Sequence, residues 1–483
     1  MPSKVTKILF CSAEVSNFAS SGGLAEVAGS LPLAIHKENK NFNVKVIMPL
    51  YKKIKETYGK KLKYLGNDTV ELAWRKLYMG LFTLKYNGID YYFIDNEYYF
   101  YRDKIYGEYD DGERFAFFSK AIFKAMNIMD FYPNIIHAND WHSALVNIYL
   151  DILYKKEGIY MDIKSVFTIH NIEYQGVFNN NFLTDVIGID YRYHEILEYN
   201  GLINLMKGAI VCSDLVTTVS PRYSREITTS TYAYGLENII RLNKSKLVGI
   251  INGIDVDSYN PATDTFIYQN FDVNSMDKKV LNKLALQKEL KLEENKDIPM
   301  IAIVSRLAGH KGMDIALDAM QGLIDLGYEV VVLGTGLYEY EERFKQFERD
   351  NPLRVKAMIE YNNGLSRKIY SSADLFLMPS RSEPCGLSQM IASRYGAVPI
   401  VRATGGLFDT IQEYEWITHI GNGFVFRDYS AYALYDKCKA AYELYKNDRD
   451  NFNMLVKNAM EKDFSWNSSA KEYINTYKKL LKK

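Results

Sequence analysis

The sequence predicts an α/β protein with two Rossmann-like domains, each built on a doubly wound parallel sheet, that face one another across a central cleft. Its 483 residues exceed what one hydrophobic core usually organises, which favours two domains. Short apolar runs typical of buried parallel strands alternate with stretches of helical periodicity in both halves. Each half also has adjacent glycines between a predicted strand and a predicted helix, at Gly22-Gly23 and Gly405-Gly406.

The composition restricts the classes of partner. The chain has 59 Lys and Arg and 59 Asp and Glu, so its formal net charge is zero, which argues against a surface for nucleic acid or for charge-driven membrane attachment. No apolar stretch approaches the roughly 20 residues that span a bilayer, and the apolar run near the N-terminus is too short for a signal peptide. The four cysteines form no CxxC pair, which is typical of the reducing cytoplasm. We therefore expect a cytoplasmic protein that binds neither nucleic acid nor membranes.

In the first half, a strand predicted at 7–12 leads through a polar loop to Gly22-Gly23, where a helix begins. Glycines at this position allow backbone amides to approach an anion closely. Further strands are predicted at 44–49, 91–95, 134–138, 165–169, 215–219 and from 246 onward. The last of these leads to Asn252-Gly253, for which a simple turn is a serious alternative to a binding role.

Polar side chains follow two neighbouring strands of this half. The segment 137–142, HANDWH, has two histidines and a carboxylate, and His170-Asn171 follows the next strand. Their spacing matches no metal-binding pattern on a helix, so we predict no metal site. Hydrogen bonding to sugar hydroxyls fits these donors and acceptors better. For His137 and His142, bracing of the loop is an equally good interpretation.

The second half begins after a loosely patterned segment, and we place the domain boundary between residues 256 and 257. A strand predicted at 300–304 is followed by Arg306 and Lys311. Two cations at the end of a strand suit a diphosphate, because arginine can grip phosphate oxygens in a fork while lysine acts as a point charge. Further strands are predicted at 330–336, 355–361, 375–378 and 398–401.

The densest group of polar residues follows the strand predicted at 375–378. Glu383 precedes Cys385-Gly386-Leu387, where a helix opens, and Thr404-Gly405-Gly406 follows the next strand. A carboxylate at this sheet edge can accept hydrogen bonds from sugar or ribose hydroxyls, and the glycine amides can face an anion. The alternative is that both turns serve only tight packing.

The run from Ser380 to Thr410, SRSEPCGLSQMIASRYGAVPIVRATGGLFDT, resembles bacterial glycogen synthases and plant starch synthases, which are retaining GT-B glucosyltransferases. The resemblance extends over nearly the whole chain. It implies transfer of glucose from ADP-glucose to the non-reducing end of an α-1,4-glucan, either glycogen or a maltooligosaccharide. It implies no cofactor, since the nucleotide sugar is a substrate. It also implies a first domain of residues 1–256, against which the last helix, 465–483, packs, and a second domain of 257–464.

The resemblance assigns roles to five residues as the catalytic set. Arg306 and Lys311 would neutralise the nucleotide diphosphate. His170 would face the transferred glucosyl unit, and Asp140 would lie beside the acceptor and donor sugars. Glu383 would orient hydroxyl groups and stabilise developing positive charge, with covalent attack the less favoured role.

The resemblance also implies a set of donor-binding residues. Within it, Tyr361 matches an aromatic residue that stacks on the nucleobase, and Asn252 matches one near the donor. The full set comprises Ser20, Gly22, Gly23, Asn252, Tyr361, Cys385, Gly386, Leu387, Thr404, Gly405 and Gly406.

One position departs from the family pattern. Ser20 stands where the K-x-G-G-L signature has its lysine, so a charge that contacts phosphate in relatives is missing or is replaced from elsewhere. UDP-glucose therefore remains an alternative donor. A sugar-nucleotide epimerase and a noncatalytic polysaccharide-binding relative are further alternatives, although the presence of Glu383, Arg306, Lys311 and His170 argues against the latter.

Overall fold

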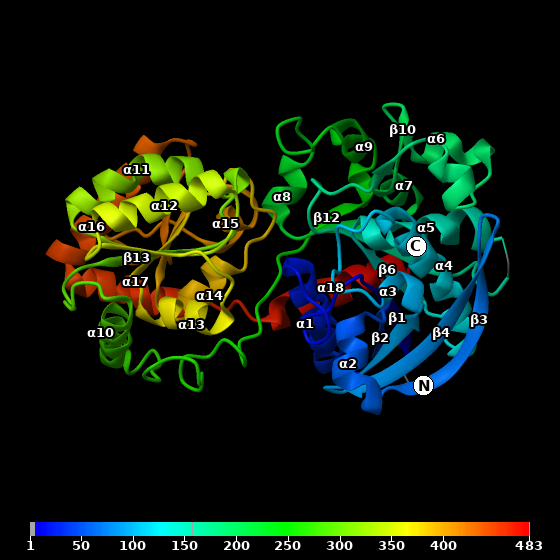
Figure 1. The fold of residues 1–483 in the computed structure, drawn as a ribbon, viewed down its shortest axis with the longest axis horizontal. Helices are drawn as coiled ribbons and strands as arrows, with labels where there is room; N and C mark the ends of the chain where they lie inside the picture. Colours follow the sequence, from blue (N-terminus) through cyan, green and yellow to red (C-terminus); the bar gives the residue numbers. More distant parts are fainter. Residues whose placement is uncertain (1–4, 157, 483) are drawn as a thin grey trace. The chain divides into compact units, whose positions relative to one another are not determined.

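The computed structural model of the chain describes residues 5–156 and 158–482, which fold into two compact units (Figure 1). Unit 1 consists of Met1–Gly253 and Trp466–Lys483, and unit 2 of Ile254–Ser465. The sequence placed these divisions after residues 256 and 464. Each unit is an α/β domain, with a mostly parallel sheet in unit 1 and an all-parallel sheet in unit 2.

Unit 1 is built on a nine-stranded sheet. Its strands are β1 (Thr6–Cys11), β2 (Phe42–Pro49), β3 (Lys63–Leu72), β4 (Arg75–Tyr86), β5 (Ile89–Asp95), β6 (Ile135–Asn139), β7 (Lys164–Ile169), β11 (Leu215–Thr218) and β12 (Leu247–Gly249). Their order is β12-β11-β7-β6-β1-β2-β5-β4-β3, with every pair parallel except β5-β4 and β4-β3. The chain runs outward from β1 to β2 and later returns to β6 on the other side, so the topological switch lies between β1 and β6. The antiparallel β3-β4 hairpin was not predicted.

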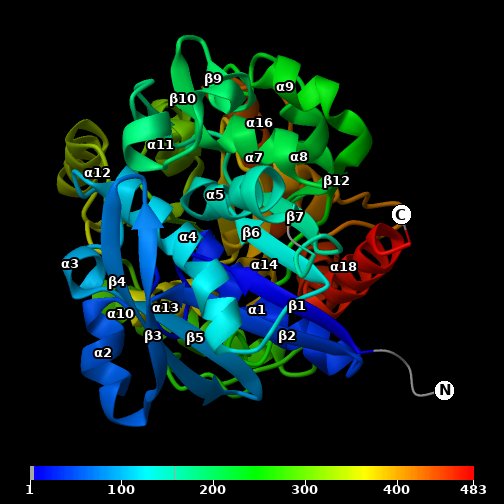
Figure 2. The same ribbon diagram turned by 90° about the vertical axis from the view of Figure 1, so that its right-hand side faces the viewer.

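The helices of unit 1 pack around this sheet (Figure 2). They are α1 (Gly23–Glu38), α2 (Lys52–Tyr58), α3 (Glu97–Phe100), α4 (Asp111–Ile128), α5 (Trp141–Tyr149), α6 (His194–Leu197), α7 (Leu205–Cys212), α8 (Pro221–Glu226), α9 (Glu237–Leu242) and α18 (Trp466–Leu480). A small antiparallel sheet is formed by β8 (Val177–Phe178), β9 (Glu198–Tyr199) and β10 (Leu202–Asn204).

Helix α18 lies against α1, far from it in sequence (Figure 2). Its Tyr477 hydroxyl is 2.7 Å from Nδ1 of His137 on β6, and Nε2 of the same ring is 2.5 Å from the Thr168 hydroxyl on β7. His137 is fully buried, and this burial lowers the pKa of its ring to about 3. The bracing interpretation therefore accounts for His137, which joins two strands and the C-terminal helix.

Unit 2 is built on a six-stranded, all-parallel sheet. Its strands are β13 (Met300–Val304), β14 (Glu329–Leu333), β15 (Val355–Met358), β16 (Leu375–Met378), β17 (Val398–Arg402) and β18 (Phe424–Phe426). Their order is β15-β14-β13-β16-β17-β18. The chain moves from β13 to one side through β14 and β15, then crosses back to β16, so the topological switch lies between β13 and β16.

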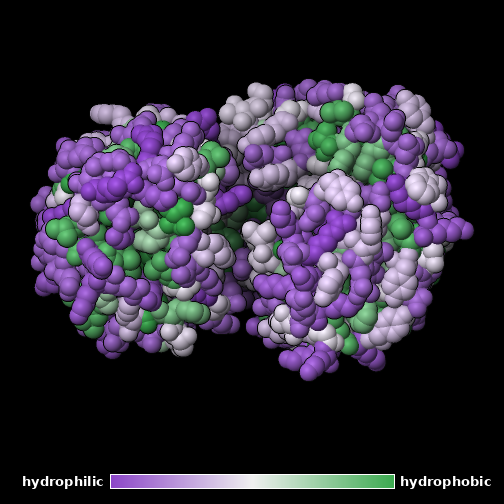
Figure 3. All heavy atoms as spheres, viewed as in Figure 1, coloured by the Kyte–Doolittle hydropathy of each residue, from purple (hydrophilic) through white to green (hydrophobic). Residues whose placement is uncertain are grey.

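Helices cover both faces of this sheet (Figure 1). They are α10 (Lys279–Leu290), α11 (Met313–Leu326), α12 (Tyr338–Asp350), α13 (Asn363–Ser372), α14 (Ser388–Arg394), α15 (Gly405–Thr410), α16 (Ala431–Asn447) and α17 (Arg449–Glu461). Helices α11 and α12 lie on one face, and α13 and α14 lie on the other. Among the helices of the described residues, none is long and apolar enough to cross a membrane. On the face drawn in Figure 3, the surface of each unit is mostly hydrophilic, with scattered apolar residues.

Buried polar contacts tie α10 to the amino end of the unit 2 sheet. Lys283 lies 2.6 Å from the carboxylate of Asp374, which also accepts the backbone N–H of Met300 at 2.8 Å. Gln287 donates its side-chain amide to Glu329, at the start of β14, at 2.8 Å. Glu329 is fully buried, and this burial raises the pKa of its carboxyl from 4.5 to about 7. Ionisation of this carboxyl therefore opposes folding.

We expect the buried Glu329 carboxyl to make unit 2 less stable as the pH rises. Because its pKa in the folded state, about 7, exceeds the unfolded value of 4.5, the folded state binds more protons between these values, and the contribution is lost as the pH passes through 7. Relative to a Glu329→Gln variant, the free energy of unfolding should fall by on the order of 1–3 kcal/mol between about pH 4.5 and pH 8. Urea unfolding followed by circular dichroism measures both curves, and parallel curves would contradict the assignment.

Candidate active site

In unit 2, the loops after β13 and β16 meet at the topological switch. After β13, the chain passes Arg306 and a short 3₁₀ turn, Gly309–Lys311, before α11 begins. The N–H of Arg381, in the loop after β16, donates to the carbonyl oxygen of His310 at 2.9 Å. Gly312 has a φ of +75°, and a Cβ there would clash with the carbonyl of Pro379. Only glycine permits this close approach of the two loops.

This approach brings together two of the predicted catalytic residues. The ammonium of Lys311 is 2.6 Å from Oε2 of Glu383, and the Ser380 hydroxyl is 3.2 Å from the same oxygen. Glu383 is only 5% exposed. A buried carboxyl group is costly without polar partners, and the Lys311 ammonium and the Ser380 hydroxyl supply them. The carboxyl group of Glu383 is therefore fixed in position.

Arg306 lies in the same loop but is not part of this pair. Its side chain is exposed, and its guanidinium has no hydrogen-bond or ion-pair partner within residues 5–156 and 158–482. A second cation thus stands at the end of β13, available to an anionic ligand. Tyr361 follows β15, and its side chain is 93% exposed, so its ring is open to stacking.

The glycine pair Gly405-Gly406 packs against the loop that carries Glu383. Gly405 has a φ of +43°, and a Cβ at this position would clash with the carbonyl oxygen of Glu383. A Cβ at Gly406 would clash with the carbonyl of Cys385. The N–H of Gly406 donates to the carbonyls of Glu383 and Pro384 at 3.1 Å each. Tight packing therefore requires glycine at both positions, and its effect is to hold Glu383; the predicted donor-binding role of the pair stays a prediction.

Gln389 was not among the predicted site residues, yet its side chain links the loop after β16 to helix α15, which follows β17. It is fully buried on α14, and its side-chain N–H groups donate to the carbonyls of Cys385 and Gly386 at 3.2 and 2.9 Å and to the Thr410 hydroxyl at 3.1 Å. Gly386 has a φ of +72°. Cys385 and Thr404 are buried in the same packing, and Leu387 is the residue before α14. In the sequence, Gln389 is recognisable only as a polar residue in the first turn of the helix that follows Leu387, which does not distinguish it from a surface residue.

In unit 1, a buried polar cluster lies at the carboxyl ends of β6 and β7. Asp140 follows β6 with a φ of +53°, which is strained for a residue other than glycine. Its Oδ1 accepts the backbone N–H of His170 at 2.8 Å and that of Asn171 at 3.5 Å. Burial raises the pKa of the Asp140 carboxyl to about 7. The two predicted residues, Asp140 and His170, are therefore in direct contact.

His170 is neutral in this setting. Its side chain is 9% exposed, and burial lowers the pKa of the ring to about 3. Nε2 of the ring is 2.9 Å from Oδ1 of Asn139, the last residue of β6. Asn139 was not among the predicted site residues.

Glu14, in the loop after β1, is a further carboxylate that the prediction missed. It is 3% exposed, and its Oε2 accepts the backbone N–H and the hydroxyl of Ser21 at 2.5 and 2.9 Å. Burial raises the pKa of this carboxyl. Ser20, Gly22 and Gly23 beside it are exposed, and a Cβ on either glycine would meet no atom within 4 Å. Unlike Gly405-Gly406, this glycine pair is not required by packing of the protein against itself.

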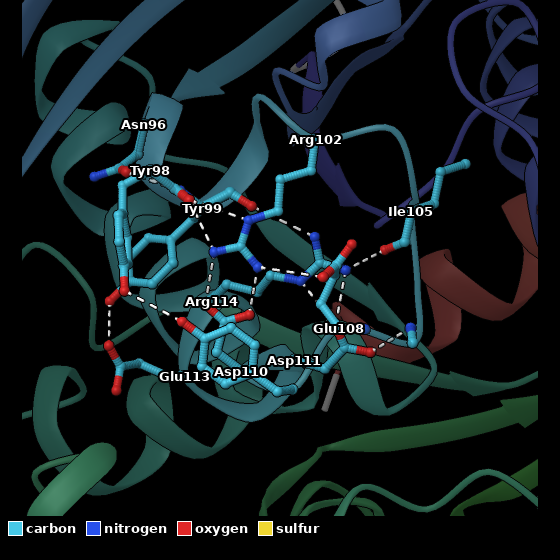
Figure 4. A network of polar contacts seen from close by, with 12 residues as sticks. Asn96, Tyr98, Tyr99, Arg102, Ile105, Glu108, Asp110, Asp111, Glu113 and Arg114 are labelled. Atoms are coloured by element: carbon cyan, nitrogen blue, oxygen red, sulfur yellow. Dashed lines mark hydrogen bonds and ion pairs between the residues drawn. The ribbon is translucent and has the colours of Figure 1, made fainter.

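The segment between β5 and α4 is held by two arginines (Figure 4). Arg102 grips both carboxylate oxygens of Asp110 at 2.5 and 2.7 Å. Arg114, fully buried, bonds the carboxylate of Asp111 at 2.9 Å and the carbonyl oxygen of Ile105. These contacts fix the backbone next to Tyr106, whose ring stacks on His142 with centroids 4.3 Å apart. Like His137, His142 is therefore a bracing residue.

Asn252 lies beyond β12 in unit 1. It is 6% exposed, and its Oδ1 is buried without a hydrogen-bond partner among the described residues. Across those residues, no group of three or more His, Cys, Asp or Glu side chains is arranged to hold a metal ion. Taken together, the buried His170 and Asp140 at the strand ends of unit 1 are suited to bind uncharged hydroxyls. The cations Arg306 and Lys311 at the switch point of unit 2 are suited to bind an anion.

Comparison with known proteins defines the class. The family model of the starch synthase catalytic domain matches residues 7–242, and that of glycosyl transferases group 1 matches residues 287–459. The solved catalytic domain of starch synthase IV from Arabidopsis thaliana, bound to ADP and acarbose, is 32% identical, covers 100% of both chains and superposes with a TM-score of 0.91. Sucrose-phosphate synthase from Thermosynechococcus elongatus, 16% identical over 99% of each chain with a TM-score of 0.60, shares the fold. The protein is a glycosyltransferase with the GT-B fold, which confirms the predicted fold class.

Curated relatives narrow the class to one family. The glycogen synthase of Finegoldia magna is 46% identical over 99% of this chain and 100% of its own length. Those of Geobacillus stearothermophilus and Lactobacillus acidophilus are 43% and 44% identical, over 99% and 98% of this chain and 98% and 100% of their own. The chain belongs to the glycogen synthase and starch synthase family, as its sequence predicted.

The two glycine pairs should respond differently to alanine. Because a Cβ at Gly405 would clash with the Glu383 backbone, Gly405→Ala should lower the free energy of unfolding by about 1–3 kcal/mol. Gly23→Ala, the matched control, meets open space and should change it by less than about 0.5 kcal/mol. Chemical denaturation of both variants measures the difference. Equal destabilisation would show that packing does not distinguish the pairs.

Proposed function

We propose that this glycogen synthase relative transfers glucose from ADP-glucose to the non-reducing end of an α-1,4-glucan, with retention of configuration. The observation that carries the proposal is the buried Lys311–Glu383 pair at the switch point of unit 2, with Arg306 exposed in the same loop. The resemblance to a starch synthase whose structure was solved with bound ADP and acarbose supports the choice of donor and of a glucan acceptor.

Arg306 and Lys311 neutralise the leaving diphosphate. The charge on a nucleoside diphosphate grows as its bond to glucose breaks, so fixed cations at the end of β13 stabilise the transition state more than the ground state. The exposed Arg306 guanidinium offers a fork of donors to phosphate oxygens. Lys311, held by Glu383 before the donor binds, contributes a point charge.

Glu383 orients hydroxyl groups of the donor and supports positive charge that develops on the glucosyl unit. A role as covalent nucleophile is less favoured, because Oε2 is already engaged by the Lys311 ammonium and the Ser380 hydroxyl, which reduces its availability for attack. The contacts from Lys311 and Ser380 hold the carboxyl group in one position, so it can support developing charge without rearranging.

His170 and Asp140 of unit 1 bind the sugar. The neutral His170 ring and the second carboxylate oxygen of Asp140 are hydrogen-bonding groups suited to hydroxyls. The acceptor hydroxyl attacks the anomeric carbon on the face from which the diphosphate departs, and the departing phosphate oxygen takes its proton. Nucleotide sugar and glucan are the substrates, and this scheme requires no cofactor. All four cysteines are buried free thiols, which supports a location in the cytoplasm.

The donor assay tests this function. The protein is incubated with glycogen and either ADP-glucose or UDP-glucose, and released ADP or UDP and incorporated label are measured. We expect faster release with ADP-glucose, label in the glucan, and a loss of roughly 10²-fold or more in kcat for Glu383→Gln. Release of neither nucleotide diphosphate would contradict the proposal, and faster release of UDP would correct the donor.

UDP-glucose stays a second candidate because of Ser20, whose exposed hydroxyl carries no charge. We expect Ser20→Lys to lower the KM for ADP-glucose by about 3- to 10-fold, since a charged hydrogen bond to phosphate is worth more than a neutral one. Steady-state kinetics of Ser20→Lys and of the neutral control Ser20→Gln measure the effect. A KM that is unchanged or raised by the lysine would show that another group has taken over this contact.

A further inference from the structure

The side-chain amide of Asn139 can face only one way. Asn139 is fully buried at the end of β6, and its Nδ2 donates to the carbonyl oxygens of Cys11 at 3.0 Å and of His137 at 3.4 Å. Carbonyl oxygens accept hydrogen bonds and cannot donate them. The reversed amide would set its own oxygen against both carbonyl oxygens, so that acceptor would face acceptor and the hydrogen bonds from Nδ2 would be lost. Oδ1 of Asn139 must therefore point away from them.

Among the described residues, the ring nitrogen that this oxygen contacts is Nε2 of His170, at 2.9 Å. Because Oδ1 can only accept, Nε2 must carry the proton. Burial lowers the pKa of the ring to about 3, so near neutral pH the ring has a single N–H and its other nitrogen, Nδ1, is bare. Within residues 5–156 and 158–482, no group hydrogen-bonds to Nδ1.

The backbone of His170 is fixed independently of its ring. Its N–H donates to Oδ1 of Asp140 at 2.8 Å, and β6 pairs with β7 so that Asn139 lies beside Thr168. Ring and backbone are thus held by two consecutive side chains, Asn139 and Asp140. Without the Asn139 oxygen, either nitrogen of the His170 ring could carry the proton. The hydrogen bond from the His170 backbone N–H to Asp140 would remain.

We propose that Asn139 is a positioning residue that holds His170 in the Nε2–H tautomer, so that Nδ1 accepts a hydrogen bond from a hydroxyl of the transferred glucose. This inference rests on the proposed function. In this tautomer Nδ1 of His170 accepts a hydrogen bond from the sugar hydroxyl and so fixes its direction. Nδ1 carries no proton that could be given to the leaving group. Asn139, which does not touch the substrate, thus determines that His170 accepts this hydrogen bond rather than donates it.

The test compares Asn139→Leu with Ser143→Ala. Leucine keeps the branching of asparagine at Cγ but has no acceptor. Ser143 is equally buried, and its hydroxyl bonds the N–H and the carbonyl of Asn139 at 2.6 and 2.7 Å, so its loss weakens the same turn without touching the His170 ring. The readouts are ¹⁵N NMR of histidine-labelled protein, with a His170→Gln sample to assign the ring, together with kcat, KM and thermal unfolding.

We expect the His170 ring of the wild type to show a protonated Nε2 and a bare Nδ1. Asn139→Leu should give a mixture of tautomers and lower kcat by about 10- to 100-fold. Ser143→Ala should keep the wild-type tautomer and a kcat within about 3-fold, even with a lower melting temperature. Asn139→Ala, which also removes the acceptor oxygen, should give the same mixture of tautomers and serves if the leucine variant does not fold.

Protonated Nδ1 in the wild type, or an unchanged tautomer in Asn139→Leu or Asn139→Ala, would each overturn the inference. An equal loss of kcat in Ser143→Ala with its tautomer intact would also overturn it, because the effect would then come from the turn. NMR of the unliganded protein reads the tautomer without turnover. Failure of the proposed function would instead appear as a wild type that transfers no glucose.

Discussion

The arrangement of unit 2 depends on one interaction, the ion pair between the Lys311 ammonium and the buried Glu383 carboxylate, 2.6 Å apart. An ionised carboxylate is expensive to bury, and the Lys311 ammonium with the Ser380 hydroxyl makes burial tolerable only if the geometry is held firmly. The surrounding backbone does this through glycines. Gly312 lets the loop of Lys311 approach Pro379, and Gly405 lets the loop after β17 approach the carbonyl of Glu383 itself. The parallel sheet thus brings the loops of Lys311 and Glu383 to the same edge, and the glycines allow these loops to pack closely together.

In unit 1, the polar groups at the ends of β6 and β7 are buried without an ion pair among the described residues, unlike the Lys311–Glu383 pair of unit 2. Burial therefore shifts the pKa of the Asp140 carboxyl upward and that of His170 downward, both toward the neutral form. Neutral donors and acceptors suit sugar hydroxyls, whereas the exposed Arg306 and the paired Lys311 of unit 2 suit a diphosphate. The strained backbone of Asp140 is consistent with a site whose side chain is held for binding rather than for stability.

The sequence predicted both sheets because their parallel strands are continuous apolar runs, and it predicted the site loops because polar residues crowd the strand ends. It missed the β3-β4 hairpin, whose strands are half exposed and lack such runs. It also could not separate packing from binding in glycine pairs, since both require the same residue. A Cβ on Gly405 or Gly406 would clash with the Glu383 loop, whereas a Cβ on Gly22 or Gly23 would meet no atom within 4 Å. The sequence did not identify Glu14, Asn139 and Gln389, because only the folded structure shows the hydrogen bonds that each makes with other segments of the chain.

A double-mutant cycle on kcat/KM for glucosyl transfer, with Lys311→Met, Glu383→Gln and the combined variant, tests the central claim that these two side chains act as one unit. Lys311→Met leaves the Glu383 carboxylate buried and unpaired, so part of its effect should vanish once Glu383 is neutral. The account predicts a coupling of about 1–3 kcal/mol, so that the double variant is less impaired than the sum of the single ones. Losses that add to within about 0.5 kcal/mol would contradict it.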